Sequence, residues 1–522
     1  VCTQESLYEQ VEGEQVLCLS TDLTYINAPQ DAQRHGLLNT KSLLQNGLRT
    51  QSECDYSLSD DTLKIVRTMI GFDGTSSQQV QIFSSLNGVK LSEQNEGQPN
   101  TAFTYDALGR VLSETVAPFT DFTATKSTAY QAAGIDGTPA MLLSTDVCGV
   151  QQRVTYDGLG RTIRIEEQDP DNPSVGALRE VYSARYDKVG HCAQETHTDW
   201  LQGVPLALDT HFDLSANQQL LITTHPNGHK TYHETDQVLM LESQWNEGAG
   251  KVVTHLNLFA KPERIETFDR NGSHLSQALN LYDGLGRCVS QTDPVGNCTT
   301  YEFDVFDRLR RSVLPDGHAV ETNYAQHSAR ALPAQVTVAG HSLGHQVFDG
   351  LGRLTQSTVG GRVTRLTYEA NGQNPVSVQK PNGDRIAYTY ERNLGEQLIA
   401  RQASGLSASY TYDSKLGLLL GCKEQSRESQ FEYSLSGRLT REVTVTEGGV
   451  QEASHLYSLA GRPLTYIDVL GAEHKTTYGA LGLPVSFEHD GLKAELSYNA
   501  LGQLVTISTR DAVGKLSVIT QL

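Results

Sequence analysis

The chain has 522 residues, with 41 Lys or Arg against 61 Asp or Glu, and its formal net charge is −20 at pH 7. This acidic excess repels a phosphate backbone and an anionic lipid surface, so we expect no nucleic-acid partner. No apolar run approaches the ~18 residues of a membrane-spanning helix, so we also expect no membrane span. The eight cysteines show neither CxxC nor zinc-ligand spacing, and we expect them to be mostly reduced.

Residues 1–100 carry only faint versions of the pattern that dominates the rest of the chain. The window 33–48 has apolar residues at roughly helical spacing, although two glycines interrupt it, so it is compatible with a helix. We expect residues 1–100 to form a divergent N-terminal β segment or a cap, because the ends of a repeat array need special faces. Residues 101–522 are expected to form the repeat array itself.

One six-residue unit returns along the chain from residue 101 onward. It reads YDALGR, YDGLGR, YDGLGR and FDGLGR at residues 105–110, 156–161, 282–287 and 348–353. Between Tyr282 and Tyr498 the aromatic positions recur every 20 to 24 residues, a period typical of solenoids and arrays. Other copies keep only part of the unit, as in YSLSGR at 433–438 and YSLAGR at 457–462. Such degenerate copies indicate a structural role.

Each unit has the local chemistry of a β-hairpin. A strand rich in Thr and Tyr, such as 299–304, runs into an Asp turn and leaves as a second strand, such as 308–314. Pro-x-Gly tripeptides then mark the following turn. We expect Asp to accept hydrogen bonds from the turn's N–H groups, Leu to lie under the turn, Gly to permit the bend and Arg to begin the outgoing strand. Tyr rings and Asp–Arg pairs would form ladders between repeats.

The pattern therefore predicts an all-β fold, a repetitive β-hairpin ribbon that either stays extended or coils on itself. We predict a structural signature without catalytic, cofactor-binding or metal-binding residues. Its members are Tyr105, Asp106, Gly109, Arg110, Tyr156, Asp157, Gly160, Arg161, Tyr282, Asp283, Gly286, Arg287, Phe348, Asp349, Gly352 and Arg353.

Two further motifs suggest chemistry. Residues 340–344 read G-x-S-x-G, which would make Ser342 the nucleophile of a lipase-like hydrolase. The next repeat's strand follows at once, however, where a nucleophile elbow requires a helix. His225, His229 and His233 are four residues apart, a metal-ligand spacing on a helix. Pro226 to Gly228 predict a turn followed by a strand, where residues four apart lie ~13 Å from each other, so we expect no metal site.

The hexapeptides, together with the Pro-x-Gly turns between them, resemble the bacterial Rhs or YD-repeat family over roughly residues 100–522. The resemblance implies a ribbon that spirals into part of a hollow shell around a toxic C-terminal segment. Such shells occur in polymorphic Rhs toxins and in insecticidal toxin complexes. Self-processing members carry a DPxG-type core segment with catalytic aspartates after the last repeat; none follows here, so we carry over no catalytic residue.

The implied partners are a toxic C-terminal polypeptide cargo, the remaining shell segment or a second shell protein, and secretion or injection machinery. The implied location is that of a secreted toxin or secretion-system effector that folds in the bacterial cytoplasm before export, with no cofactor. The main alternative is a cell-surface adhesin or carbohydrate-binding repeat protein, in which exposed tyrosines would stack on sugars. A hydrolase using Ser342 is the third hypothesis.

Overall fold

The computed structural model describes residues 3–11, 14–31, 33–171, 178–510 and 516–521. These residues form 44 strands and one 3-10 helix, so the predicted all-β fold is confirmed. The chain divides into two compact units, Val1–Ala124 with Leu279–Tyr410 (unit 1) and Thr125–Ala278 with Thr411–Leu522 (unit 2). This division does not test the predicted boundary near residue 100, which stays a prediction.

Unit 1 contains β1 (Gln4–Val11), β2 (Glu14–Tyr25), β3 (Leu38–Gln45), β4 (Leu48–Ser59), β5 (Thr62–Ile70), β6 (Ser76–Ser84), β7 (Lys90–Gln94), β8 (Thr101–Tyr105), β9 (Val111–Val116), β23 (Cys288–Thr292), β24 (Cys298–Phe303), β25 (Leu309–Val313), β26 (Ala319–Tyr324), β27 (Pro333–Val338), β28 (His341–Phe348), β29 (Leu354–Val359), β30 (Arg362–Tyr368), β31 (Pro375–Gln379), β32 (Arg385–Glu391), η1 (Arg392–Leu394) and β33 (Gln397–Ala403).

Unit 2 contains β11 (Ala140–Thr145), β12 (Gln151–Tyr156), β13 (Thr162–Gln168), β14 (Leu178–Tyr186), β15 (Cys192–Leu201), β16 (Val204–Leu214), β17 (Leu220–Thr224), β18 (Lys230–Asp236), β19 (Leu241–Asn246), β20 (Lys251–Leu256), β21 (Pro262–Phe268), β35 (Leu419–Glu424), β36 (Arg427–Tyr433), β37 (Leu439–Thr446), β38 (Gly449–Tyr457), β39 (Pro463–Ile467), β40 (Glu473–Tyr478), β41 (Pro484–His489), β42 (Leu492–Tyr498), β43 (Leu504–Arg510) and β44 (Leu516–Gln521). The unit boundaries fall inside β10 (Ala124–Gln131), β22 (His274–Tyr282) and β34 (Leu406–Tyr412).

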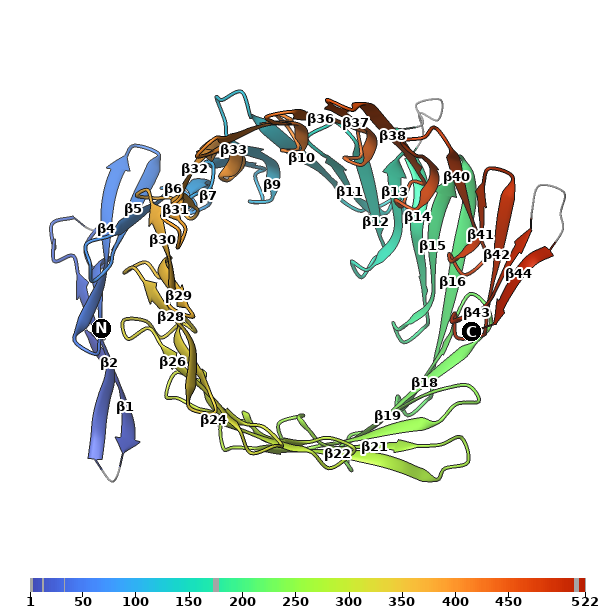
Figure 1. Cartoon of the computed structure of the whole chain (residues 1–522), viewed down its shortest axis with the longest axis horizontal. Helices are drawn as coiled ribbons and strands as arrows, with labels where there is room; N and C mark the ends of the chain where they lie inside the picture. The colour runs from blue at the N-terminus through green and yellow to red at the C-terminus, as the bar shows by residue number, and fades with distance from the viewer. Residues whose placement is uncertain (1–2, 12–13, 32, 172–177, 511–515, 522) are drawn as a thin grey trace. The chain divides into compact units, whose positions relative to one another are not determined.

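Strands that follow each other in the chain pair antiparallel, which gives the predicted hairpin ribbon (Figure 1). A register shift recurs where the signature aromatic residue ends its strand, for example at Tyr156, Phe348 and Tyr457. The shift is a β-bulge, and a bulge re-aims the side chain at that position. A local bend of the ribbon therefore lies at the start of each of these turns.

The helix considered for residues 33–48 is wrong, because this window holds the hairpin of β3 and β4. Asn46 and Gly47 form its two-residue turn with φ of 48° and 78°. An Asn-Gly pair at positive φ matches the right-handed twist of the flanking strands, so the glycine is a hairpin signal rather than a helix break.

Fully buried side chains are few and small. The buried apolar residues are mainly alanines, and the largest fully buried side chain among the described residues is that of Ser458. Strands such as β16 alternate between exposed and half-buried positions. The described residues include no helix of the length and apolarity that a bilayer crossing requires. Ladder hydrogen bonds and turn contacts therefore matter more here than a thick apolar core.

Candidate functional site

The signature turn at residues 156–161 shows how the hexapeptide closes. Asp157 Oδ1 accepts hydrogen bonds from the N–H groups of Leu159 (2.9 Å) and Arg161 (3.0 Å). Its Oδ2 accepts one from Arg161 Nε at 2.7 Å. Gly160 has φ of 78°, a left-handed conformation that glycine adopts without steric cost. One carboxylate thus satisfies two backbone donors and one guanidinium.

The other three copies repeat this geometry. The Asp Oδ2 to Arg Nε distance is 2.7 Å for Asp106–Arg110, 2.7 Å for Asp283–Arg287 and 2.8 Å for Asp349–Arg353. Hydrogen bonds within the turn lower the aspartate pKa values: chiefly the Arg110 backbone N–H for Asp106, the Arg161 side chain for Asp157 and the Arg287 backbone N–H for Asp283. The glycines Gly109, Gly286 and Gly352 all have positive φ.

The signature arginine also reaches forward to the next repeat. Arg161 Nη1 donates to the carbonyl oxygen of Gly190 at 3.0 Å, and its guanidinium carbon lies 4.1 Å from the centroid of the Tyr186 ring. Arg287 lies 5.1 Å from the ring centroid of Phe303 in the same way. These cation–π contacts join consecutive turns without a ligand.

The signature tyrosine reaches back to the preceding repeat. Of the predicted signature residues, Tyr105 shows this bond; at this position of several repeats the hydroxyl donates to a backbone carbonyl 14 to 24 residues earlier, in the pairs Tyr105–Lys90 (2.5 Å), Tyr186–Thr162 (3.0 Å), Tyr368–Leu354 (2.8 Å), Tyr478–Pro463 (2.8 Å) and Tyr498–Pro484 (2.7 Å). The signature residues therefore do not converge on one site. Each set closes its own turn and is joined to its neighbours along the ribbon.

In three of the four intact hexapeptides the leucine does not lie under the turn, so that prediction is wrong for them, whereas Leu351 of the fourth is half-buried. Leu108, Leu159 and Leu285 are 77%, 78% and 75% exposed. The aspartate holds the N–H of this residue at the tip of the turn, and the side chain is left facing solvent.

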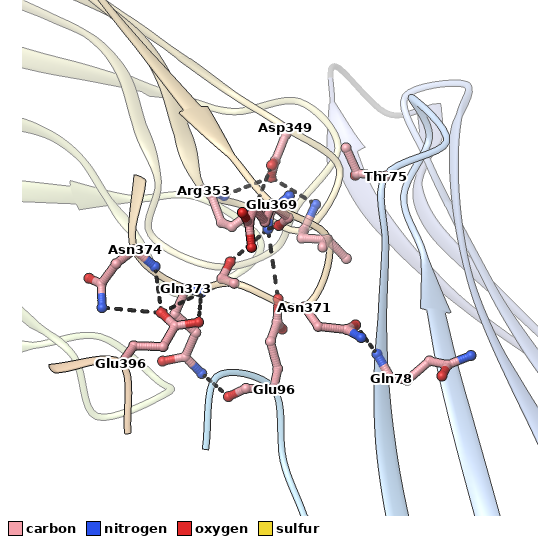
Figure 2. A network of polar contacts seen from close by, with 12 residues as sticks. Thr75, Gln78, Glu96, Asp349, Arg353, Glu369, Asn371, Gln373, Asn374 and Glu396 are labelled. Atoms are coloured by element: carbon pink, nitrogen blue, oxygen red, sulfur yellow. Dashed lines mark hydrogen bonds and ion pairs between the residues drawn. The ribbon is translucent and has the colours of Figure 1, made fainter. Parts of the chain in front are cut away.

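Unit 1 contains a lateral contact that the sequence did not indicate. We call it the unit 1 seam, formed by residues 71–97 and 326–373. Asn371 Oδ1 accepts the Gln78 N–H at 2.8 Å, and Gln373 Nε2 donates to the Glu96 carbonyl at 2.8 Å (Figure 2). The loop between β30 and β31 accordingly lies against β6 within this unit.

Arg353 and Glu396 bind the loop at residues 369–373, the part of the seam that comes later in the sequence. Arg353 donates to the carbonyl oxygens of Glu369 (3.0 Å) and Gly372 (2.7 Å), and its guanidinium lies 4.8 Å from the Tyr368 ring centroid (Figure 2). The buried Glu396 accepts the N–H of Gln373 at 3.0 Å. The Asp349–Arg353 pair thus also supports the loop 369–373, which contacts β6 and the residues just after β7.

Two glycines meet at the centre of the unit 1 seam. Asp73 Oδ2 accepts the Gly350 N–H at 2.9 Å. A Cβ built on Gly71 would lie 2.5 Å from Gly350 Cα, so neither residue has room for a side chain. Burial opposes ionisation of Asp73, but hydrogen bonds from Thr75 and Gly350 outweigh it and lower the pKa.

Protonation of His327 is expected to loosen the unit 1 seam. Its ring lies 4.7 Å from that of Phe72, and burial lowers its pKa. Arg330 acts in the same direction, whereas Asp73 and Asp349 oppose it. Because the folded pKa is depressed, the neutral ring's contribution is complete above the unfolded value of about 6.5 and is lost as the pH falls below it.

Thermal unfolding measured from pH 7.5 to 5 should therefore show stability falling below about pH 6.5, and His327→Gln should flatten this slope. His318→Gln is the matched control, since His318 is exposed beside Asp316. A slope that His327→Gln leaves unchanged would contradict the assignment.

Unit 2 has an equivalent contact, the unit 2 seam, between Asp171 with residues 199–227 on one side and residues 436–500 on the other. Asn227 Nδ2 donates to the Ala500 carbonyl at 2.6 Å, and Leu459 N–H donates to the Trp200 carbonyl at 3.1 Å. Hydrogen-bonded partners are separated by 259–273 residues here and by 274–293 in the unit 1 seam. The hexapeptide encodes neighbours one repeat away, so its spacing could not reveal these partners.

The remaining motifs lie on hairpins. Ser342 is in β28 directly after the Ala339–Gly340 turn, and its Oγ lies 3.3 Å from Gln335 Nε2, so no strand-to-helix elbow surrounds it. The rings of His225 and His229 stack with centroids 6.3 Å apart, and His233 lies in β18. No group of metal-ligating side chains occurs within the described part of the chain. No disulfide joins any two of the seven described cysteines, and Cys2 lies outside the described residues.

One stretch of the repeat array matches a known family. The RHS Repeat family model matches residues 282–319, which begin with the turn at 282–287 and end in β26. The chain carries an RHS repeat. The resemblance inferred from the hexapeptides is thereby confirmed at one of its intact copies. No curated protein sequence matches the chain.

Solved toxin-complex structures share the fold of this RHS-repeat chain. "TcdB2-TccC3 without hypervariable C-terminal region" aligns with a TM-score of 0.54 at 11% identity over 98% of this chain and 36% of that one. TcdB2-TccC3 aligns with a TM-score of 0.50 at 11% identity over 99% of this chain and 40% of that one. At this identity the likeness shows the fold. The chain spans about two-fifths of the length of these structures.

Proposed function

We propose that this chain is a wall segment of a toxin-complex-type shell that encloses and helps deliver a toxic polypeptide, with no catalytic chemistry of its own. The observation that carries the proposal is the lateral seam found within each unit. An RHS-repeat ribbon that binds itself side to side makes a continuous wall, whereas a ribbon without lateral contacts would make a rod.

The turn chemistry supports this role. The signature aspartates close their own turns, and arginine and tyrosine side chains such as those of Arg161 and Tyr105 contact neighbouring repeats, so such a wall would need neither cofactor nor metal. Leucines at the turn tips are exposed, as at Leu108 and Leu285, and exposed apolar side chains suit contact with an incompletely folded polypeptide. The proposed partners are such a cargo, the remaining shell segment or a second shell protein, and injection machinery. The proposed location is that of a secreted toxin.

Small-angle X-ray scattering of the purified chain tests the proposal. A ribbon of 44 strands at ~4.8 Å per strand would be about 210 Å long if it stayed straight. We expect instead a compact particle with a depleted centre and no distances near that length. A rod-like profile extending far beyond ~100 Å would overturn the shell and favour the adhesin hypothesis.

A further inference from the structure

One signature turn in unit 2 lacks the aspartate that closes its relatives. In the YSLAGR turn at 457–462, Ser458 stands where Asp157 stands in YDGLGR. The Ser458 hydroxyl oxygen accepts the Arg462 N–H at 3.0 Å, which is one of the three bonds that Asp157 makes in its own turn. Arg462 Nε donates to the Gly482 carbonyl at 3.3 Å, so the backbone N–H two residues after the serine and Arg462 Nη1 are the donors that still need an acceptor.

Asp199 of β15 supplies that acceptor from 259 residues earlier in the chain. Its Oδ1 accepts the Ala460 N–H at 2.8 Å, and its Oδ2 accepts the Ser458 hydroxyl at 2.7 Å and pairs with the Arg462 guanidinium. The Ala460 N–H corresponds to the Leu159 N–H that Asp157 holds within its own turn. Ser458 and Asp199 together therefore accept the hydrogen bonds that Asp157 accepts alone in its own turn.

The surroundings fix Asp199 as an ionised acceptor. Only 2% of its side chain is exposed. Burial opposes ionisation, but hydrogen bonds from Ala460, Ser458 and Arg462 outweigh it and lower the pKa of Asp199. The neighbouring Trp200 carbonyl accepts the Leu459 N–H at 3.1 Å, so backbone and side chain bind the same turn. Removing the carboxylate would leave buried donors unpaired, which is costly.

The other YSLxGR copy is also reached by an acidic side chain, although there the contact is made by the hydroxyl at the variable position and not by the turn's backbone N–H. In the turn at 433–438, Ser434 replaces the aspartate, and the Ser436 hydroxyl donates to Asp171 Oδ2 at 2.7 Å, 265 residues away. By contrast, the turn at 348–353 in the unit 1 seam keeps Asp349, and Asp73 binds only its backbone N–H. An acidic side chain therefore reaches all three turns, but only at Ser458 does it accept the N–H and guanidinium bonds that a turn's own aspartate would make.

We propose that a YSLxGR turn is a docking site for an acidic side chain of a neighbouring ribbon, and that Asp199 with residues 457–462 forms a clasp that holds the unit 2 seam. In an intact YDxLGR turn, the aspartate itself accepts the backbone N–H groups and the arginine guanidinium, so closure of the turn needs no partner. When serine replaces this aspartate, the turn closes fully only if an acidic side chain of a neighbouring ribbon docks on it. This inference goes beyond the shell proposal, because it holds whether or not the chain encloses a cargo.

Hydrogen exchange of two amides separates turn closure from docking. The Ala460 amide reports closure, and the Leu459 amide reports docking, because its acceptor is the Trp200 carbonyl. In Asp199→Asn we expect both amides to exchange at least tenfold faster. In Asp199→Asn combined with Ser458→Asp, the introduced carboxylate should protect Ala460 again, whereas Leu459 should stay fast.

Asp157→Asn is the matched control, because it removes a turn's own carboxylate in the same unit. It should accelerate exchange at Leu159 and leave Leu459 unchanged. Should Asp199→Asn fail to fold, Ser458→Asp alone places two carboxylates in the clasp and should accelerate Leu459 at least tenfold. The proposal is overturned by wild-type protection of Leu459 in either single variant, or by its recovery in the double variant.

Discussion

Replacing Gly350 with alanine is expected to open the unit 1 seam. The new methyl group would overlap the Gly71 backbone and the Asp73 carboxylate, and the Gly71 backbone cannot swing aside as a flexible side chain could. Overpacking of this kind costs about 1–3 kcal/mol. We expect a lower melting temperature and faster exchange of the Gly350 amide, which donates to Asp73.

The chain supplies its own controls for this substitution. Gly158 and Gly284 occupy the same position of the hexapeptide, and a Cβ on either would meet no atom within 4 Å. None of the three glycines has a positive φ, so alanine fits the backbone at each. Alanine at a compatible glycine stabilises by about 0.4–1 kcal/mol through the unfolded chain. Gly158→Ala and Gly284→Ala should therefore leave the melting temperature unchanged or raise it, and a loss equal to that of Gly350→Ala would contradict the seam assignment.

This comparison also shows what the sequence could and could not predict. The hexapeptides at 156–161 and 282–287 are identical, and the one at 348–353 differs only in its first residue. Turn closure is local chemistry, so the all-β ribbon and the hydrogen-bonding role of the aspartate followed from residue types alone. The need for glycine at residue 350 arises from Gly71, which lies 279 residues earlier, and nothing within the repeat encodes that distance.

The same reason explains the interpretation of the degenerate copies. The degenerate copies indicate a structural role, but nothing in the sequence shows that Asp199 supplies the carboxylate that the turn at Ser458 lacks. The exposure of the turn leucines could not be predicted for a different reason. An apolar side chain is expected to pack beneath a turn. The aspartate, however, binds the backbone N–H of the leucine, and this places the leucine at the tip of the turn.

Replacing Arg353 with alanine is expected to have the largest effect of the signature substitutions we consider. Only 13% of the Arg353 side chain and 5% of the Asp349 side chain are exposed. Breaking a buried pair by removing one partner costs about 3–5 kcal/mol, because the remaining charge is left uncompensated. Arg353→Ala also removes the bonds to the Glu369 and Gly372 carbonyls, so the loop that carries Asn371 should lose its support.

Exchange of the Gln78 amide, which donates to Asn371, measures this loss. A cost of about 3 kcal/mol corresponds to roughly a hundredfold faster exchange, since each 1.4 kcal/mol is about tenfold. Arg110→Ala is the matched control: the same hexapeptide position, the same Asp–Arg bond, but 42% exposure of the arginine side chain. Solvent screens that pair, so the amide of Leu108 in its turn should accelerate less than tenfold. Equal effects in the two turns would mean that the hexapeptide acts alike wherever it occurs. A large difference would mean that lateral burial turns a common turn motif into a support of the seam.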